Sequence, residues 1–115
     1  VSPDALQVTS FQVEQDGSKV RLMFETNGDL EFKTFYLKDP SRILVSFAKG
    51  VHSKVEETIA VNKQGVLTVR QHFRSREAQS NLGKPLNAIV VDLDKSSEVK
   101  VYNDLDTFII EVEKG

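Results

Sequence analysis

Short apolar or alternating segments, separated by turn residues, run through the whole chain, and no segment keeps helical spacing of apolar residues over ten positions. The pattern predicts strands at residues 6–14, 19–26, 31–38, 42–48, 65–74, 87–94, 98–102 and 107–113. Residues 55–60 fit either one helical turn or an edge strand. Valine occurs 15 times, and this β-branched residue favours strands. Eight short strands with closely spaced turns predict an all-β sandwich or barrel.

Two local features refine this prediction. The apolar phase of the first segment slips between Val8 and Phe11, which predicts a β-bulge. The sequence Asn27-Gly28-Asp29 is typical of a tight hairpin turn, because asparagine and glycine tolerate positive φ values. We therefore expect a hairpin between residues 19–26 and 31–38.

The two halves of the chain resemble each other. The apolar pattern of residues 22–32 recurs in residues 91–101, 69 positions later, and that of residues 43–45 recurs in residues 108–110, 65 positions later. An internal duplication of a four-strand unit would produce this repeat and predicts a sandwich of two facing four-stranded sheets. Chance is the alternative, because any two three-strand meanders align to some degree.

Composition excludes several classes of function. The 115 residues suit one domain, residues 1–115, and the absence of an initial methionine suggests a piece of a longer protein. The formal net charge of −2 argues against a nucleic-acid ligand. No apolar run approaches the roughly 18 residues of a membrane span, so no membrane insertion is expected. The chain has no cysteine, which excludes disulfides, thiolate metal sites and a cysteine nucleophile.

The sequence also lacks a recognisable catalytic arrangement. His52 and His72 do not have metal-ligand spacing, and neither a nucleophile elbow nor a phosphate-binding loop is present. Asp92 and Asp94 share one face of a strand, as paired carboxylates of a glycosidase would, but a solvated strand end is the favoured interpretation. We therefore predict a protein that is not an enzyme and that needs no metal or cofactor.

A local charge asymmetry provides the candidate binding site. Residues 62–86 carry a net charge of +4 (five bases, one acid) and residues 87–115 carry −4 (three bases, seven acids). Period two places Arg70, His72 and Arg74 on one face of a strand, and Leu67, Val69 and Phe73 on the other, core-facing side. Arginine forks suit carboxylates and phosphates. The alternative is an ordinary β face on which the arginines pair with acids such as Asp92 and Asp94.

A family resemblance covers nearly the whole chain. Asp39-Pro40-Ser41-Arg42 followed by Ile43-Leu44-Val45, then residues 65–71, then Ile89-Val90-Val91-Asp92-Leu93, resemble in order and spacing the motifs of AMIN domains. These are the N-terminal targeting domains of bacterial N-acetylmuramoyl-L-alanine amidases, and they also occur in type IV pilus secretins. His72-Phe73 replace a glycine that the family usually has, and the loop at residues 75–85 is long.

The resemblance implies two facing four-stranded sheets and a non-catalytic, periplasmic role: binding peptidoglycan and localising an attached amidase or secretin. Together with the basic residues that share one strand face, the resemblance makes the following residues candidates for ligand binding: Arg70, His72, Arg74, Gln71 and Arg42. The alternative function is a protein–protein docking module that meets a secretin, pilus or divisome partner through a sheet edge, with the first strand as the candidate edge.

Overall fold

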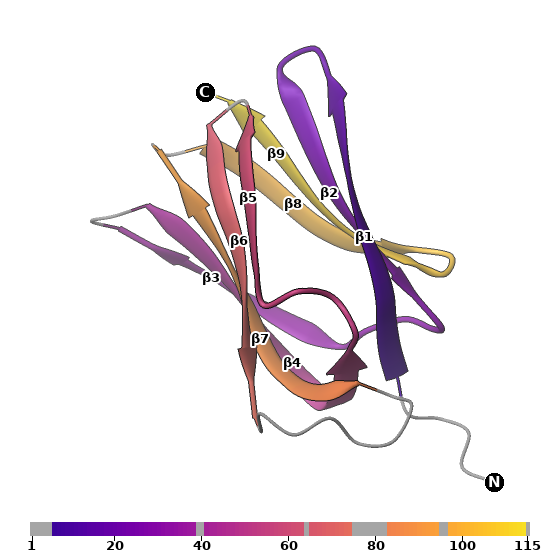
Figure 1. The fold of residues 1–115 in the computed structure, drawn as a ribbon. Coiled ribbons are helices and arrows are strands. Elements are labelled where there is room, and N and C mark those ends of the chain that lie inside the picture. Colours follow the sequence, from indigo (N-terminus) through magenta and orange to yellow (C-terminus); the bar gives the residue numbers. More distant parts are fainter. Residues whose placement is uncertain (1–5, 39–40, 64, 75–82, 95–96, 115) are drawn as a thin grey trace, which may run out of the picture.

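The computed structural model describes residues 6–38, 41–63, 65–74, 83–94 and 97–114, and every regular element in them is a β-strand (Figure 1). The all-β prediction is confirmed. The strands are β1 (Leu6–Asp16), β2 (Lys19–Thr26), β3 (Phe32–Leu37), β4 (Arg42–Ser53), β5 (Thr58–Lys63), β6 (Val66–Phe73), β7 (Lys84–Leu93), β8 (Ser97–Asp104) and β9 (Thr107–Lys114).

These strands hydrogen-bond into one sheet in the order β5-β6-β7-β4-β1-β2-β9-β8; β3 lies outside this order and pairs with β4. Residues 42–47 of β4 lie between β3 and β7, whereas residues 51–53 pair with β7 and, in parallel, with residues 6–8 of β1. The sheet therefore curves back on itself, so that β3, β4, β7 and β6 face β8, β9, β2 and β1 across a nearly closed, barrel-like core (Figure 1).

The core is apolar and centred on aromatic rings. The Phe108 ring lies 5.2 Å from Phe32, 5.7 Å from Phe47 and 6.3 Å from Phe24, measured between centroids. Phe24 and Phe108 are completely buried. Each such ring stabilises the fold by roughly 1.5–3 kcal/mol through burial, and the tilted contacts add to that. Because these rings come from β2, β3, β4 and β9, their packing joins the two sides of the curved sheet.

The structure bears on three further predictions: the bulge in the first strand, the fold of residues 55–60 and the loop at residues 75–85. The predicted bulge in the first strand is confirmed, because the β1–β2 register shifts between Val8 and Ser10. Residues 58–63 form an additional strand, β5, which pairs only with β6 among the described strands, so the edge-strand alternative for this region is correct. Most of the loop predicted at residues 75–85 lies outside the described residues; the part from Lys84 already belongs to β7.

The hairpin predicted at Asn27-Gly28-Asp29 is wrong. β2 pairs with β1 and β9, so both of its edges are occupied, and the chain crosses to the opposite side of the core, where β3 pairs with β4. Leu30 lies in this crossing segment and is buried in the core, with 2% of its surface exposed. The Asn103 side chain fixes this crossing, because it accepts from the Leu30 amide (3.0 Å) and donates to the Leu30 carbonyl (3.1 Å).

Candidate functional site

The alternation along β6 decides which candidate residues reach the surface. Val69 is buried and the adjacent Arg70 is half-exposed, as the period of two predicts. The prediction that Leu67 faces the core is wrong: Leu67 is 39% exposed and Val66 is buried instead. The reason is a register irregularity between Val66 and Thr68, which reverses the alternation at the start of the strand.

Three cross-strand rows form the outer surface of β3, β4, β7 and β6, which we call the basic face. The rows are Lys33–Ser46–Ala88–His72, Phe35–Leu44–Val90–Arg70 and Leu37–Arg42–Asp92–Thr68. The face carries three cationic side chains and His72 against a single carboxylate. Phe35 is 46% exposed and Leu37 36% exposed at its β3 edge. Cationic and apolar groups therefore lie side by side on this face.

The centre of the basic face is an ion pair between Arg70 and Asp92. The Arg70 Nε donates to Asp92 Oδ2 at 2.7 Å and Nη2 donates to Oδ1 at 3.0 Å, while the Thr68 hydroxyl donates to Oδ2 at 2.5 Å. Partial burial raises the pKa of the Asp92 carboxyl, but hydrogen bonds from Arg70 and Thr68 and the charges of Arg70 and Arg42 lower that pKa by more. Asp92 is thus held ionised, and Arg70 has the acidic partner that the alternative interpretation proposed.

Arg42 lies beside this ion pair, and its charge also acts on the Asp92 carboxylate. It is the cross-strand partner of Asp92 on β4, but both Asp92 oxygens are engaged by Arg70 and Thr68. The Arg42 Nε is buried and has no hydrogen-bond partner among the described residues. Asp92 is therefore the one carboxylate in the three rows for both arginines, so the rows keep a net positive charge.

Gln71 does not reach the basic face. It lies on the core side of β6 and is 4% exposed. Its Oε1 accepts from the Ser53 hydroxyl at 2.6 Å, and its Nε2 donates to the carbonyls of Glu56 (2.5 Å) and Val55 (3.3 Å). These hydrogen bonds join β6 to the end of β4 and to the segment before β5. Its role is structural.

The two remaining candidates, His72 and Arg74, differ in position. His72 is exposed on the basic face, opposite Ala88. Arg74 is exposed too, but it lies one residue beyond the end of β6, where its backbone amide donates to the Pro85 carbonyl at 2.7 Å. Of the five candidates, Arg70, His72 and Arg42 therefore share the face.

Sequence reasoning missed the apolar side of this face. The β3 residues Lys33, Phe35 and Leu37 point outward, whereas Phe32 packs against the core. The signal was present, because the alternation from Phe32 onward places Phe35 and Leu37 on the opposite face to Phe32. Tyr36 is 59% exposed at the strand edge, with its hydroxyl donating to the Val99 carbonyl at 3.0 Å.

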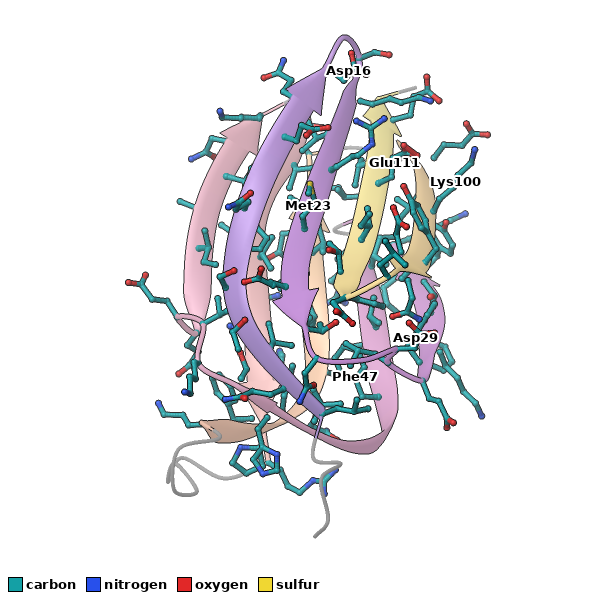
Figure 2. All side chains as sticks on the ribbon, turned by 90° about the vertical axis from the view of Figure 1, so that its right-hand side faces the viewer. Asp16, Met23, Asp29, Phe47, Lys100 and Glu111 are labelled. Atoms are coloured by element: carbon teal, nitrogen blue, oxygen red, sulfur yellow. The ribbon has the colours of Figure 1, made fainter. Side chains whose placement is uncertain are left out.

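The opposite outer surface, formed by β1, β2, β9 and β8, is acidic (Figure 2). We call it the acidic face. Its outward positions include seven acidic and three basic residues: Glu14, Asp16, Glu25, Glu98, Asp104, Glu111 and Glu113 against Lys19, Arg21 and Lys100. Four of these acids come from the acidic stretch at residues 87–115, whereas Arg70 alone of the five bases in residues 62–86 lies in the rows of the basic face.

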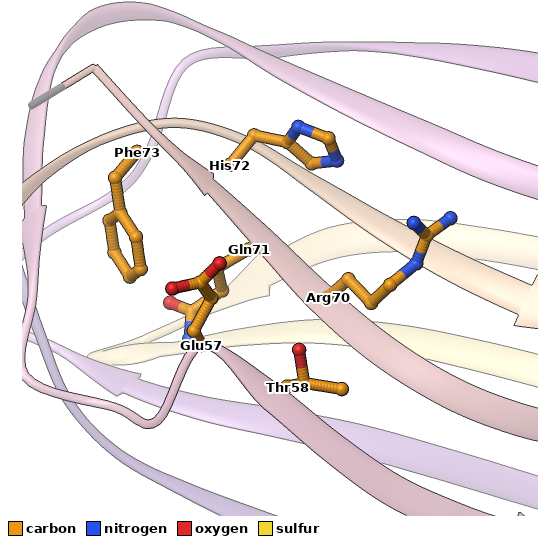
Figure 3. Close-up of a pocket in the computed structure, with 6 residues that line it drawn as sticks. All are labelled: Glu57, Thr58, Arg70, Gln71, His72 and Phe73. Carbon is orange, nitrogen blue, oxygen red and sulfur yellow. The ribbon is translucent and has the colours of Figure 1, made fainter. Parts of the chain in front are cut away.

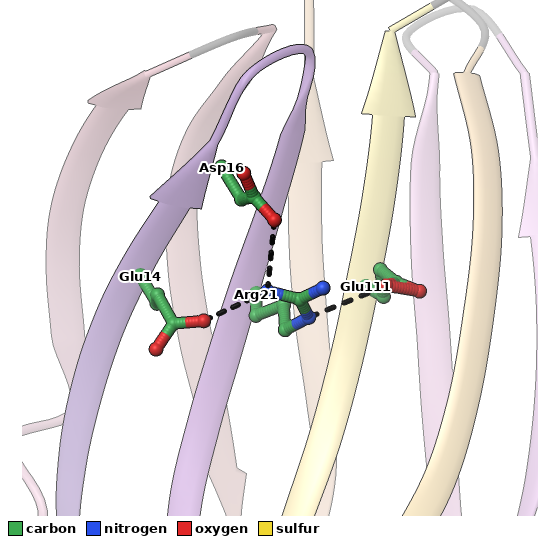
Figure 4. A network of polar contacts seen from close by, with 4 residues as sticks. All are labelled: Glu14, Asp16, Arg21 and Glu111. Carbon is green, nitrogen blue, oxygen red and sulfur yellow. Dashed lines mark hydrogen bonds and ion pairs between the residues drawn. The ribbon is translucent and has the colours of Figure 1, made fainter.

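Arg21 organises the acidic face. Its guanidinium lies 2.7 Å from Glu14, 3.4 Å from Glu111 and 3.8 Å from Asp16, so it links β1, β2 and β9 (Figure 4). The hydrogen bond to Glu14 raises the pKa of Arg21, and the Glu111 charge acts in the same direction. Arg21 therefore has three carboxylates around it, two from β1 and one from β9.

The described residues include no group of three or more histidine, aspartate or glutamate side chains placed to hold a metal ion. Nor does this part of the chain contain a helix with the length and apolar character needed to cross a membrane.

No protein-family model matches the chain, and no curated protein matches its sequence. The AMIN resemblance therefore stays a prediction that rests on the order of short motifs.

Proposed function

We propose that this domain is a non-catalytic targeting module that binds peptidoglycan through the basic face. In this proposal it works in the periplasm, where it localises an attached amidase or secretin at the cell wall. The observation that carries the proposal is the excess of cationic side chains over the single carboxylate in the rows of the basic face, beside the exposed Phe35 and Leu37.

The chemistry of the face suits a polymer of sugars and short peptides. Arginine recognises carboxylates such as those of peptide stems through paired hydrogen bonds. Phe35 offers an exposed ring on which the apolar side of a sugar can pack. Phe35 and Arg70 lie in the same row across three strand intervals, which places them about 14 Å apart. One face can thus contact a sugar and a peptide carboxylate together.

The two faces would also orient the domain. A surface with seven acids and three bases is repelled by an anionic polymer, whereas the basic face is attracted to it. Flat faces bury little area, so we expect weak binding, with a Kd of micromolar or above. Weak binding suits a module that concentrates an enzyme on a large polymer.

Pelleting with isolated sacculi tests the proposal. The wild-type domain should sediment with sacculi at low salt, and Arg42→Gln should weaken binding about tenfold, or about 1.4 kcal/mol. Lys100→Gln is the matched control, since it removes one positive charge from the acidic face and should bind no more weakly than wild type. A wild-type domain left in the supernatant would contradict the proposal.

The second candidate is a docking module for an envelope protein. Residues 6–8 of β1 pair with β4, so the N-terminal end of β1 is not a free edge. Among the described strands, β5 pairs only with β6, which makes it the better site for strand addition. Capture of one specific envelope protein by the domain, together with indifference to sacculi, would favour this candidate.

We further propose that the continuous sheet is a sandwich of two facing four-stranded sheets that arose by duplication. The pairing supports this. β1–β2 and β3–β4 in the first half correspond to β6–β7 and β8–β9 in the second. The crossed pairs β2–β9 and β4–β7 correspond to each other as well. In this scheme each sheet contains strands of both halves, and β5 is an addition at one edge.

A further inference from the structure

The basic face and the acidic face cover opposite sides of the core and carry opposite net charges (Figure 1). The rows of the basic face hold three cationic side chains and one carboxylate, a net charge of +2. On β6, Arg70 and His72 extend to the same side of the strand, away from Glu57 (Figure 3). The acidic face holds seven acids and three bases, a net charge of −4. Unlike faces of two copies therefore attract each other.

An apolar row crosses each of the two faces between charged residues. The row on the basic face consists of Phe35, Leu44 and Val90. The row on the acidic face consists of Tyr102, Ile109 and Met23. Phe35 is 46% exposed, and Tyr102 and Met23 are half-buried. Each row thus offers apolar surface that a partner can cover.

One strand in each face places an exposed charge next to the apolar row. On β3, Lys33 and Phe35 point outward two residues apart, and on β2, Glu25 and Met23 do the same. Alternate residues of a strand are about 6.7 Å apart, so the two pairs have matching spacing. A depression of about 80 Å³ beside the β2 pair has room for the end of one side chain. It is lined by Ser10, Gln12, Met23, Glu25 and Thr107.

The charges of these two pairs are available to another molecule. Within the described part of the chain, neither Lys33 nor Glu25 forms an ion pair. The Glu25 carboxylate accepts hydrogen bonds from the hydroxyls of Ser10 (3.2 Å) and Thr9 (3.4 Å), which do not neutralise it. Both charged side chains are exposed. Each can therefore pair with an opposite charge that a partner supplies.

We propose that the partner is a second copy of this chain, and that the basic face of one copy packs on the acidic face of the next. In this contact the Phe35 ring covers Met23, and the Lys33 ammonium donates to the Glu25 carboxylate. Because the two faces lie on opposite sides of the core, each contact leaves one face of either kind free, and further copies add in a row. The inference goes beyond the proposed function, since the row and peptidoglycan would compete for the same basic face.

The size of the faces indicates weak association. The four strands of the basic face span about 14 Å and its three rows about 13 Å along the strands. A contact of this size buries less than the roughly 1,200 Å² of a stable interface. The exposed charges are also screened by salt. We therefore expect a Kd of about 0.1–1 mM at low salt.

Sedimentation velocity of the whole domain, from about 10 μM to about 1 mM, tests the inference. At about 20 mM salt the average sedimentation coefficient should rise with protein concentration, and at about 0.5 M salt this rise should disappear. A coefficient that keeps the monomer value at every concentration, or a rise that salt does not reduce, would overturn the inference.

Charge exchange tests the proposed pairing. Lys33→Glu and Glu25→Lys should each weaken association about tenfold, and the two changes in one chain should restore it, because the charges are exchanged. The matched controls are Lys63→Glu, at the end of β5, and Glu56→Lys, before β5. Both controls change an exposed charge outside the rows of both faces and should associate like wild type. Equal behaviour of Glu25→Lys and Glu56→Lys, or no restoration in the double variant, would overturn the inference.

The inference and the proposed function can fail separately. Salt-sensitive association without sedimentation on sacculi would retain the inference and reject the proposed function. Sedimentation on sacculi by a domain that stays monomeric would do the reverse.

Discussion

Replacing Gln71 by alanine should destabilise the fold. Gln71 was a candidate ligand-binding residue on sequence grounds, but its side chain is buried and its amide is used by Ser53, Val55 and Glu56. The substitution removes one acceptor and two donated bonds at the point where β6 meets the end of β4. If this placement is correct, the loss appears in the free energy of unfolding.

The size of the effect follows from these contacts. Each hydrogen bond contributes about 0.5–1.5 kcal/mol net, and a buried group left without a partner costs about 1–3 kcal/mol. Ser53 is 2% exposed, so its hydroxyl would lose its acceptor away from water. The exposed Glu56 segment can recruit water for its carbonyl. We therefore expect a loss of about 2–4 kcal/mol, or about 8–16 °C in Tm for a domain of this size.

Urea and thermal unfolding, followed by circular dichroism, measure this loss. Gln12→Ala is the control, because Gln12 is exposed on β1 and its removal should change stability by less than about 0.5 kcal/mol. Ser53→Ala combined with Gln71→Ala should cost less than the sum of the single changes, since both remove the same bond. Equal stability of Gln71→Ala and Gln12→Ala, or strict additivity of the pair, would refute the reasoning.

Two further predictions concern the Asp92 carboxyl and the turn glycines. Because the pKa of Asp92 is lowered in the folded protein, its ionised form stabilises the fold above the ordinary value of 3.8 and this contribution is lost as the pH falls further. Asp92→Asn should therefore show a smaller loss of stability in urea titrations between about pH 5 and pH 2 than wild type; an unchanged pH profile would count against the ion pair. Gly17 and Gly83 both have positive φ, 62° and 98°. Gly17→Ala should cost about 1 kcal/mol, since its Cβ meets nothing within 4 Å, whereas at Gly83 it would collide with the Ser53 carbonyl and cost at least about 2 kcal/mol in urea unfolding. Equal costs at the two glycines would contradict this.

Local patterns predicted most of the strands because each strand alternates between a buried and an exposed side. β2 is an example: its bounds agree with the prediction, and Val20, Leu22 and Phe24 are buried in turn. Pairing was harder to predict. The Asn27-Gly28 sequence suits a hairpin, but the edges of β2 are taken by β1 and β9, and that competition is not local.

The candidate site was predictable in part for the same reason. Alternation correctly placed Arg70 and His72 on the surface, and it would have placed Gln71 in the core. The bulge that exposes Leu67 depends on pairing with β7 and could not be read from β6 alone. Which of the two arginines hydrogen-bonds to Asp92 follows only from the fold.

NMR mapping with soluble peptidoglycan fragments tests the central claim most directly, because it reports which face meets the polymer. We expect saturable shifts at outward residues of the basic face, above all at Phe35, Leu37, Arg42 and Arg70, with the acidic face around Arg21 unchanged. Shifts concentrated on the acidic face, or no shifts at fragment concentrations that saturate sacculus binding, would contradict the account.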